Sequence, residues 1–237
     1  MKKLPVPPAM EPFLDGRVLL IDKPLGMTSF GVIRIIRDLI IVSKVGHAGT
    51  LDPLATGLLI ICTGNFTKNI NDYMGMEKEY TGSFTIGART PTYDLESQPE
   101  DIIDIAGITS AQILDATKLF TGPIMQVPPI HSAIKQGGKP VYLAARKGEE
   151  VVLQPRPVTI KTFEITGIEL PKVYFRVVCS TGTYIRSLAN DFGRALGVGA
   201  HLSSLRRTRI GQFTVEAALT IDSFEQTVKE MYSPKRM

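Results

Sequence analysis

The stretch GHAGTLDPLATG, residues 46 to 57, sets a histidine, an aspartate and a proline among small residues, just before the apolar run LLIIC. Asp52 ahead of Pro53 is typical of a helix start, with the aspartate as N-cap and the proline in the first turn. That interpretation leaves the glycines and His47 unexplained. Because glycine permits unusual backbone geometry and close approach of a ligand, the stretch also fits a rigid loop that presents Asp52 as a nucleophile.

A second unusual placement lies in STGTYIRSLANDFG, residues 180 to 193, where Arg186 falls in the first turn of a predicted helix. A cation at that end of a helix opposes the helix dipole, at a cost of roughly 0.3–1 kcal/mol. A nearby carboxylate would relieve the cost, and it would suit the bidentate geometry of a guanidinium. A solvent-exposed arginine that tolerates its position explains the pattern equally well.

Length and composition restrict the class of protein. The chain has 237 residues, enough for one large domain or two small ones, and 43% of them are hydrophobic, which is ordinary for a globular protein. We find no run long enough to span a membrane, and prolines interrupt the N-terminus where a secretory signal would need an apolar stretch. Cys62 and Cys179 lie in apolar strand-like runs, so we expect buried thiols of a cytoplasmic protein.

Several kinds of site are excluded. Three histidines and two cysteines are scattered through the chain, so we expect no metal site. No Walker loop, dinucleotide fingerprint or nucleophile elbow is present, and we expect no cofactor. The net charge is only +4, but two groups of basic residues stand out: Lys135, Lys139, Arg146 and Lys147, and Arg186, Arg194, Arg206, Arg207 and Arg209. Such clusters fit a polyanion, although a solvated basic face would look the same.

The order of predicted elements favours an α+β fold. Strands are predicted at 17–24, 80–88 and on both sides of Leu170–Pro171, and helices at 30–40, 109–120 and 183–197. LLIIC reads as a buried strand or helix segment, and 121–150 as an irregular segment. Asp222 and Glu225 are spaced like the capping box of a last helix. Because strands and helices do not alternate strictly, we predict a mixed sheet flanked by helices.

Six ordered blocks resemble the TruB family of tRNA pseudouridine-55 synthases. The blocks extend from Arg17 to about Gln212, and GHAGTLDPLATG is the most specific. They are LLIDKPLGMTSF (19–30), GHAGTLDPLATGLLIICTGNFTK (46–68), KEYTGSFTIGARTPTYDLES (78–97), QVPPIHSAIKQGGKPVYLAARKG (126–148), CSTGTYIRSLANDFG (179–193) and GAHLSSLRRTRIG (199–211).

The resemblance implies a pseudouridine synthase fold, with a mixed, mostly antiparallel central sheet, flanking helices and a thumb-like insertion at about 124–150. We expect an N-terminal arm at 1–16 and a catalytic domain at 17–237. Only about 25 residues follow Gln212, so we expect no C-terminal PUA domain. His131 stands where the thumb motif of the family leads us to expect a tyrosine.

The resemblance also implies roles for individual residues. Asp52 matches the catalytic aspartate, Tyr80 the tyrosine that packs against the target base, and Arg186 the arginine that pairs with the aspartate. His47 matches a loop histidine that engages RNA, Leu205 a pocket residue and Lys68 a basic residue near the cleft. The full set expected to contact RNA is His47, Lys68, Tyr184, Leu205, Lys135, Arg146, Arg206 and Arg207.

The expected activity is isomerisation of uridine 55 in the tRNA T loop to pseudouridine, by an RNA-binding isomerase of tRNA processing. The base must be flipped into the enzyme, and the N1–C1′ bond must break before the base rejoins through C5. We expect a monomer without an obligatory protein partner. Two alternatives stay open: a non-catalytic chaperone of tRNA folding, and a related synthase that acts on another RNA.

Overall fold

The computed structural model describes residues 7–130, 132, 135–136, 139–140 and 153–232. The chain forms two compact units, one of residues 1–78 with 206–237 and one of residues 79–205. We call them the first and the second unit.

The first unit combines a small sheet with helices. Its strands include β1 (Val18–Lys23), β2 (Val45–His47), β3 (Ala55–Thr63), β11 (Phe213–Thr214) and the C-terminal part of β10 (Ala200–Ile210). β3 lies between β1 and β10, β2 also pairs with β3, and β11 pairs with β10. The helical elements are η1 (Pro8–Met10), α1 (Glu11–Asp15), α2 (Ser29–Ile40), η2 (Gly64–Asn69), α3 (Ile70–Gly75), η4 (Val215–Ala217) and α7 (Ile221–Tyr232).

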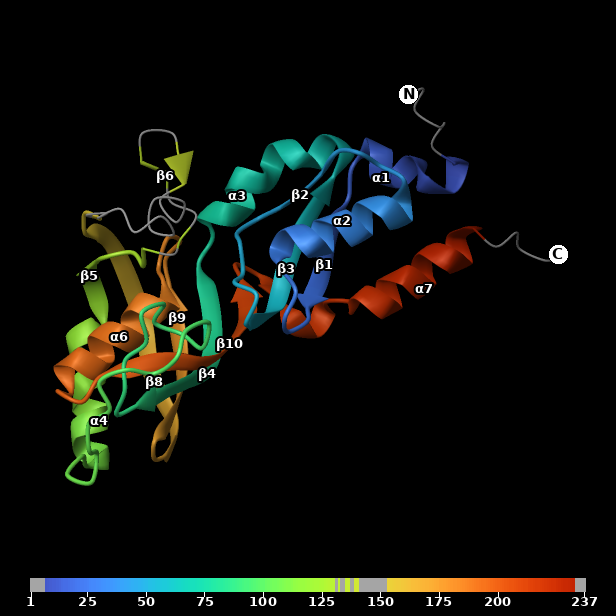
Figure 1. The fold of residues 1–237 in the computed structure, drawn as a ribbon. Helices are drawn as coiled ribbons and strands as arrows, with labels where there is room; N and C mark the ends of the chain where they lie inside the picture. The colour runs from blue at the N-terminus through green and yellow to red at the C-terminus, as the bar shows by residue number, and fades with distance from the viewer. Residues whose placement is uncertain (1–6, 131, 133–134, 137–138, 141–152, 233–237) are drawn as a thin grey trace. The chain divides into compact units, whose positions relative to one another are not determined.

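Strand β3 is the centre of the first unit because its two faces enter two apolar clusters. Leu59 and Ile61 pack with α2, α7 and Phe13 of α1, which cover one side of β1 and β3 (Figure 1). Leu58, Ile60 and Cys62 point into the other cluster. This two-sided burial explains why LLIIC is uniformly apolar, where a strand with one wet face would alternate.

Two local signals set helix α2. The side chain of Thr28 accepts a hydrogen bond from the amide of Gly31 and caps the first turn. Val32, Ile33, Ile36 and Ile40 then recur at helical spacing and are buried against β1 and β3. The helix ends at Ile40, and the next residue, Ile41, adopts a left-handed conformation with φ 56°.

The second unit is built on β4 (Lys78–Ile86), β5 (Gly122–Gln126), β8 (Arg156–Glu169), β9 (Lys172–Cys179) and the N-terminal part of β10. The strand order is β10–β4–β9–β8–β5, with antiparallel pairing of β8 to both β5 and β9. A separate two-stranded ladder joins β6 (Lys135–Gln136) and β7 (Lys139–Pro140). The helical elements are α4 (Ser110–Ala116), η3 (Thr117–Phe120) and α6 (Ile185–Ala195).

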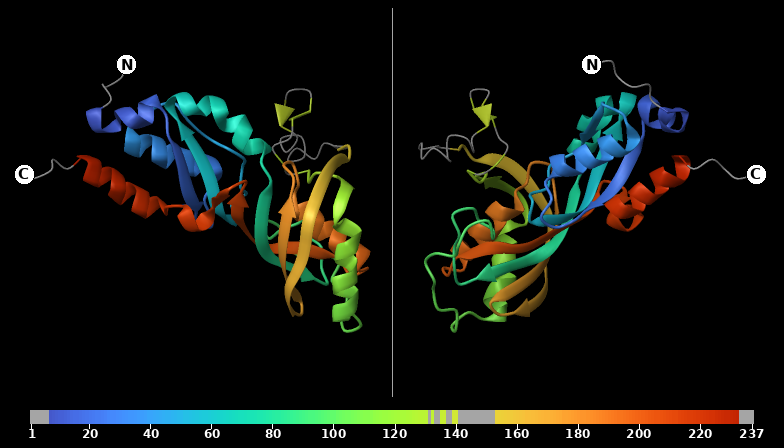
Figure 2. Two further views of the ribbon diagram at one scale, coloured as in Figure 1. Left: turned by 180° about the vertical axis from the view of Figure 1, so that it is seen from behind. Right: turned by 45° about the vertical axis from the view of Figure 1, so that its right-hand side comes forward.

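Helix α6 lies against the sheet of the second unit (Figure 2), and an aromatic cluster fills the contact. Phe192 of α6 lies 5.6 Å from both Phe84 of β4 and Phe163 of β8, measured between ring centroids. Phe84 stacks on Phe175 of β9 at 4.3 Å. Rings of this size contribute most of the apolar area in the contact, so they hold α6 at a defined position on the strands.

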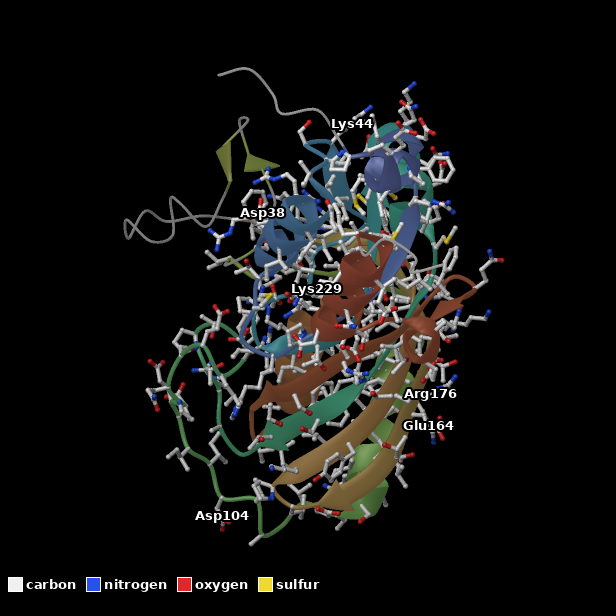
Figure 3. All side chains as sticks on the ribbon, turned by 90° about the vertical axis from the view of Figure 1, so that its right-hand side faces the viewer. Asp38, Lys44, Asp104, Glu164, Arg176 and Lys229 are labelled. Atoms are coloured by element: carbon white, nitrogen blue, oxygen red, sulfur yellow. The ribbon has the colours of Figure 1, made fainter. Side chains whose placement is uncertain are left out.

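The solvent side of the same strands carries charged pairs. Glu164 of β8 and Arg176 of β9 are directly opposite in the ladder, and their side chains lie side by side (Figure 3). Arg176 pairs with Glu164 at 3.4 Å and with Glu79 at 2.8 Å. Exposed pairs of this kind contribute little to stability, so the aromatic cluster is the stronger constraint.

Most predicted elements are confirmed, and three details are corrected. LLIIC is a strand. Asp52 and Pro53 begin a turn into β3, so the helix start is wrong. The last helix is capped by Thr220, whose hydroxyl accepts from the amide of Ser223, instead of by Asp222. The irregular segment contains β5, which pairs with β8 along its whole length.

The segment expected as an N-terminal arm is partly packed. Residues 8–15 form η1 and α1, and their Met10 and Phe13 are buried against α2 and α7.

Gly57 should be intolerant of any side chain. Its φ is +102°, and a Cβ there would lie 2.3 Å from the carbonyl oxygen of Arg207 on β10. We expect Gly57→Ala to lower the free energy of unfolding by at least about 3 kcal/mol, because the β3 and β10 backbones would have to separate. Gly26→Ala is the matched control, since Gly26 also has positive φ but meets nothing within 4 Å. Urea unfolding that gave equal losses for both variants would contradict this explanation.

Candidate active site

The loop that carries Asp52 is held at both ends by backbone hydrogen bonds. β2 and β3 form an antiparallel pair, and the amide of Ala48 donates to Ile60 at 2.9 Å where the loop leaves β2. The amide of Ala55 donates to the carbonyl of Asp52 at 3.0 Å where the loop enters β3. Asp52 itself is partly exposed.

Ser29, the first residue of α2, fixes the middle of the loop. Its hydroxyl accepts from the amide of Leu51 at 2.9 Å and donates to the carbonyl of the same residue at 3.0 Å. Leu51 is itself buried. The residue before Asp52 is therefore anchored by its backbone and its side chain, which leaves the carboxylate on a loop with little freedom.

Lys23, at the end of β1, is a fully buried cation beside the same loop. Its Nζ donates to the carbonyls of Met27 at 2.6 Å, Pro24 at 3.0 Å and Pro53 at 3.3 Å. Burial lowers the pKa of Lys23 to about 8, and the nearby Arg207 cation adds to the effect. The carboxylate of Asp52 acts in the opposite direction, which places its charge within electrostatic reach of the ammonium.

Arg207 of β10 is a second buried cation at this loop, with 1% of its surface exposed. Its guanidinium donates to the carbonyls of Leu58 at 2.8 Å, Gly49 at 3.1 Å and Thr50 at 3.5 Å. The expectation that Arg207 contacts RNA is therefore wrong, because its donors are used to fix the protein backbone. Its role is to hold the 49–50 segment against β3.

The other residues of the first unit that were expected to contact RNA keep part of their surface exposed. Arg206 forms a two-pronged pair with Asp22, at 2.7 and 3.0 Å, and stays partly exposed. Lys68, in η2, is exposed. His47 is partly exposed, and its pKa is lowered by burial first and by the Arg207 cation second, while a backbone hydrogen bond with Gly49 opposes both. Because its pKa is lowered, His47 places a neutral imidazole beside the loop.

In the second unit, Arg186 forms a buried ion pair with Asp94. The distance from its Nη1 to Oδ2 of Asp94 is 3.4 Å, and the exposed fraction of each side chain is 5%. The same Nη1 donates to the carbonyl of Thr92 at 3.3 Å. The predicted pairing of Arg186 with Asp52 concerns residues of different units and stays a prediction.

Asp94 is a candidate that reasoning from the sequence missed. It stands in TPTYDLES, within a block that carries the family resemblance, but no spacing rule connects it to Arg186. The Asp94 carboxylate is also held on its other oxygen, since Oδ1 accepts a hydrogen bond from the amide of Glu96 at 3.0 Å. The sequence offered one signal for Asp94: it is an aspartate, without an assigned role, inside a block that resembles the family.

The remaining predicted residues of the second unit fall into three groups. Tyr80, on β4, has 8% of its surface exposed. Tyr184 precedes α6, and its backbone exchanges two hydrogen bonds with the side chain of Gln126, while Leu205 is partly exposed on β10. Arg146 lies outside the described residues, and of Lys135 only the backbone in β6 is described.

Neither a metal site nor a membrane span is found in the described parts of the chain. No group of three or more His, Cys, Asp or Glu side chains could hold a metal ion there. Among those same residues, no helix combines the length and apolarity that crossing a bilayer requires. Within the first unit, the site offers carboxylate, ammonium and imidazole chemistry around one anchored loop.

Two family models match consecutive parts of the chain. The model described as TruB family pseudouridylate synthase (N terminal domain) matches residues 37–185, and that described as tRNA pseudouridylate synthase B C-terminal domain matches residues 186–235. Proteins named tRNA pseudouridine synthase B are similar over nearly the whole chain. That of Flavobacterium johnsoniae is 51% identical over 226 residues, covering 92% of this chain and 99% of the relative. That of Chloroherpeton thalassium is 48% identical over 221 residues, covering 91% and 92%.

Solved structures share the fold. A chain in the crystal structure of a Cbf5–Nop10–Gar1 complex is 30% identical and superposes with a TM-score of 0.72 over 96% of this protein. A chain in the structure of an H/ACA RNP bound to a substrate RNA containing 2′-deoxyuridine is 29% identical. It superposes with a TM-score of 0.70 over 94% of this protein. This protein spans 60% and 57% of the length of those chains.

The buried ammonium of Lys23 should make stability depend on pH with a defined sign. Its pKa is about 8 in the folded chain against 10.5 ordinarily, so the unfolded chain binds more protons between those values. The cost of burying the cation is fully present below pH 8 and is relieved as pH rises. We therefore expect the free energy of unfolding of wild type, relative to Lys23→Met, to increase from about pH 7 to pH 10. Urea unfolding that gave the same change of free energy with pH for wild type and Lys23→Met would contradict this prediction.

Proposed function

The chain belongs to the TruB family of pseudouridine synthases, and from that membership we propose that it converts a uridine of tRNA into pseudouridine. Support comes from the two family models, from relatives named tRNA pseudouridine synthase B, and from the fold. The observation that carries the proposal is the anchored loop, in which Ser29, Lys23 and Arg207 hold the backbone on both sides of Asp52.

Asp52 is proposed as the catalytic carboxylate. The reaction breaks the N1–C1′ bond, turns the base and joins C1′ to C5, with loss of the hydrogen at C5. An ionised carboxylate can act as nucleophile or stabilise positive charge that develops at C1′, as carboxylates do in glycoside hydrolysis. The charges of Asp52 and Lys23 attract each other, and a fixed loop avoids the entropic cost of positioning the carboxylate during reaction.

Tyr80 and Arg186 are proposed to act on the same nucleoside. A target base in a folded loop must be unstacked at a cost of a few kcal/mol, and an aromatic ring can offset part of this by stacking. Arg186 is nearly fully buried and oriented by Asp94 and the carbonyl of Thr92, so its guanidinium is held in one geometry. We propose that Asp94 is the residue that positions Arg186.

The finer parts of the proposal concern substrate and setting. We propose that the uridine is position 55 of the T loop, that the T arm is the main contact, and that the enzyme acts as a cytoplasmic monomer. Lys68 and Arg206, which keep part of their surface exposed, are proposed to contact phosphates. His47 and Tyr184 are proposed to contact the RNA, and Leu205 to line the pocket. A chaperone of tRNA folding is the alternative, and turnover separates the two functions.

Release of tritium from uridine labelled at C5 tests the activity. We expect wild type to release it stoichiometrically from a T-arm stem-loop, because joining C1′ to C5 expels that hydrogen. Asp52→Asn keeps the size of the side chain and removes its charge, so release should fall below detection while the RNA still binds. Turnover by Asp52→Asn would refute the catalytic assignment. Tight binding by wild type without release would favour the chaperone.

Asp94→Asn tests the positioning of Arg186. Removing one partner of a buried pair leaves the other charge uncompensated, at about 3–5 kcal/mol. We expect kcat for tritium release to fall at least about tenfold. A tenfold loss corresponds to about 1.4 kcal/mol of activation free energy, which is less than the cost of the unpaired charge. Asp115→Asn is the control, because Asp115 pairs with Lys118 on an exposed surface. Equal rates for the two variants would count against the role of Asp94.

A further inference from the structure

Tyr93 has a backbone conformation that its residue type disfavours. Its φ is +64°, in the left-handed region where a bulky L-residue is an outlier. The amide of Tyr93 donates to the carbonyl of Thr90 at 3.1 Å, which closes a turn with Pro91 at its second position. In type I turns with proline there, glycine is the favoured fourth residue. The chain therefore keeps an aromatic residue where glycine or asparagine would be less strained.

The left-handed backbone at Tyr93 lets its two neighbours bind the same arginine. Tyr93 lies between Thr92 and Asp94, and the Thr92 carbonyl and the Asp94 carboxylate converge on one nitrogen of Arg186, at 3.3 and 3.4 Å. The carbonyl of Tyr93 accepts from the amide of Leu202 at 2.9 Å, which anchors the turn to β10 within the second unit. These contacts explain the left-handed backbone, and they would be met equally well by glycine. They do not explain the phenol ring.

Neither a hydrogen bond nor an aromatic pair among the described residues accounts for the ring. Tyr93 is partly exposed, its hydroxyl makes no hydrogen bond with the described residues, and it belongs to none of their aromatic pairs. Its phenol lies within electrostatic reach of Arg89, whose pKa is raised first by Asp101 and more weakly by Tyr93. Arg89 pairs with Asp101, and both side chains are about half exposed, so the ring stands near an ion pair that solvent reaches.

We propose that Tyr93 contacts the substrate, and that its ring stacks on a nucleobase of the RNA beside the Arg186–Asp94 pair. An aromatic ring near an exposed arginine is a combination that binds single-stranded nucleotides, through stacking and through attraction to the phosphate backbone. Strained residues persist where the surrounding structure over-determines them, and they cluster at functional sites. The inference rests on the proposed function, because it takes the RNA as the occupant.

Variants that tolerate the left-handed backbone isolate the ring. Tyr93→Gly and Tyr93→Asn relieve the strain and keep the turn that holds Arg186, so we expect their melting temperatures to equal or exceed that of wild type. Tritium release from the T-arm stem-loop should then show KM raised about tenfold, the scale of one lost base–aromatic stack, with kcat changed less. Tyr93→Phe keeps the ring and should retain a KM within about twofold of wild type.

Ile41→Gly is the matched control, because Ile41 is also left-handed and exposed but ends α2 in the first unit. It should not alter KM. Unchanged KM in Tyr93→Gly, a lowered melting temperature that shows the ring packs in the protein, or a loss in Tyr93→Phe equal to that in Tyr93→Gly would each overturn the proposal. Absence of release by wild type would instead refute the proposed function, so the two failures are distinguishable.

Discussion

The candidate site depends on the burial of two cations against backbone carbonyls. Lys23 and Arg207 are almost fully removed from water, and both use carbonyl oxygens of the loop around Asp52 as acceptors. A buried charge without compensation is costly, and Arg207 lowers the pKa of Lys23, so the two cations disfavour each other. The charge of Asp52 opposes that effect on Lys23. The carboxylate is therefore part of the electrostatic balance of the fold as well as the proposed reactive group.

The glycines of this region follow from the same constraint. Arg207 can reach Gly49, Thr50 and Leu58 only because β10 runs very close to β3, and Gly57 is the position where a Cβ would collide with the β10 backbone. Gly49 has a φ of +90°, which turns its carbonyl toward the guanidinium. The question raised by small residues around one aspartate thus has a structural answer. The glycines allow a cation and a strand to approach the loop.

The second unit uses a different device to orient a charged group. Arg186 lies in the first turn of α6, where the helix dipole disfavours a cation, and the buried carboxylate of Asp94 compensates. The aromatic cluster of Phe84, Phe163 and Phe192 holds α6 on the sheet. The left-handed turn at Tyr93 brings two acceptors to the same guanidinium nitrogen. A rigid helix and a strained turn together define one side-chain geometry.

Local patterns in the sequence were sufficient for the elements whose signals are local. The helices expected at 30–40, 109–120 and 183–197 were found because caps and amphipathic periods involve neighbouring residues. In the structure Thr28 caps α2, Thr109 caps α4, and Gly197 follows α6 with φ 76°. β5 was missed because it is defined by its pairing with β8, about 35 residues away, and Asp222 was taken for the cap that Thr220 provides.

The sequence by itself determined the α+β class, the family and the candidates Asp52, Tyr80 and Arg186, because residue types and their order along the chain are enough for a motif. Only the tertiary structure decided that Arg207 is buried in the protein, that Lys23 holds Pro53, and that Arg186 pairs with Asp94. Each of those contacts joins residues 30 to 158 positions apart. Burial and charge compensation at such separations depend on how strands pair, which no local pattern encodes.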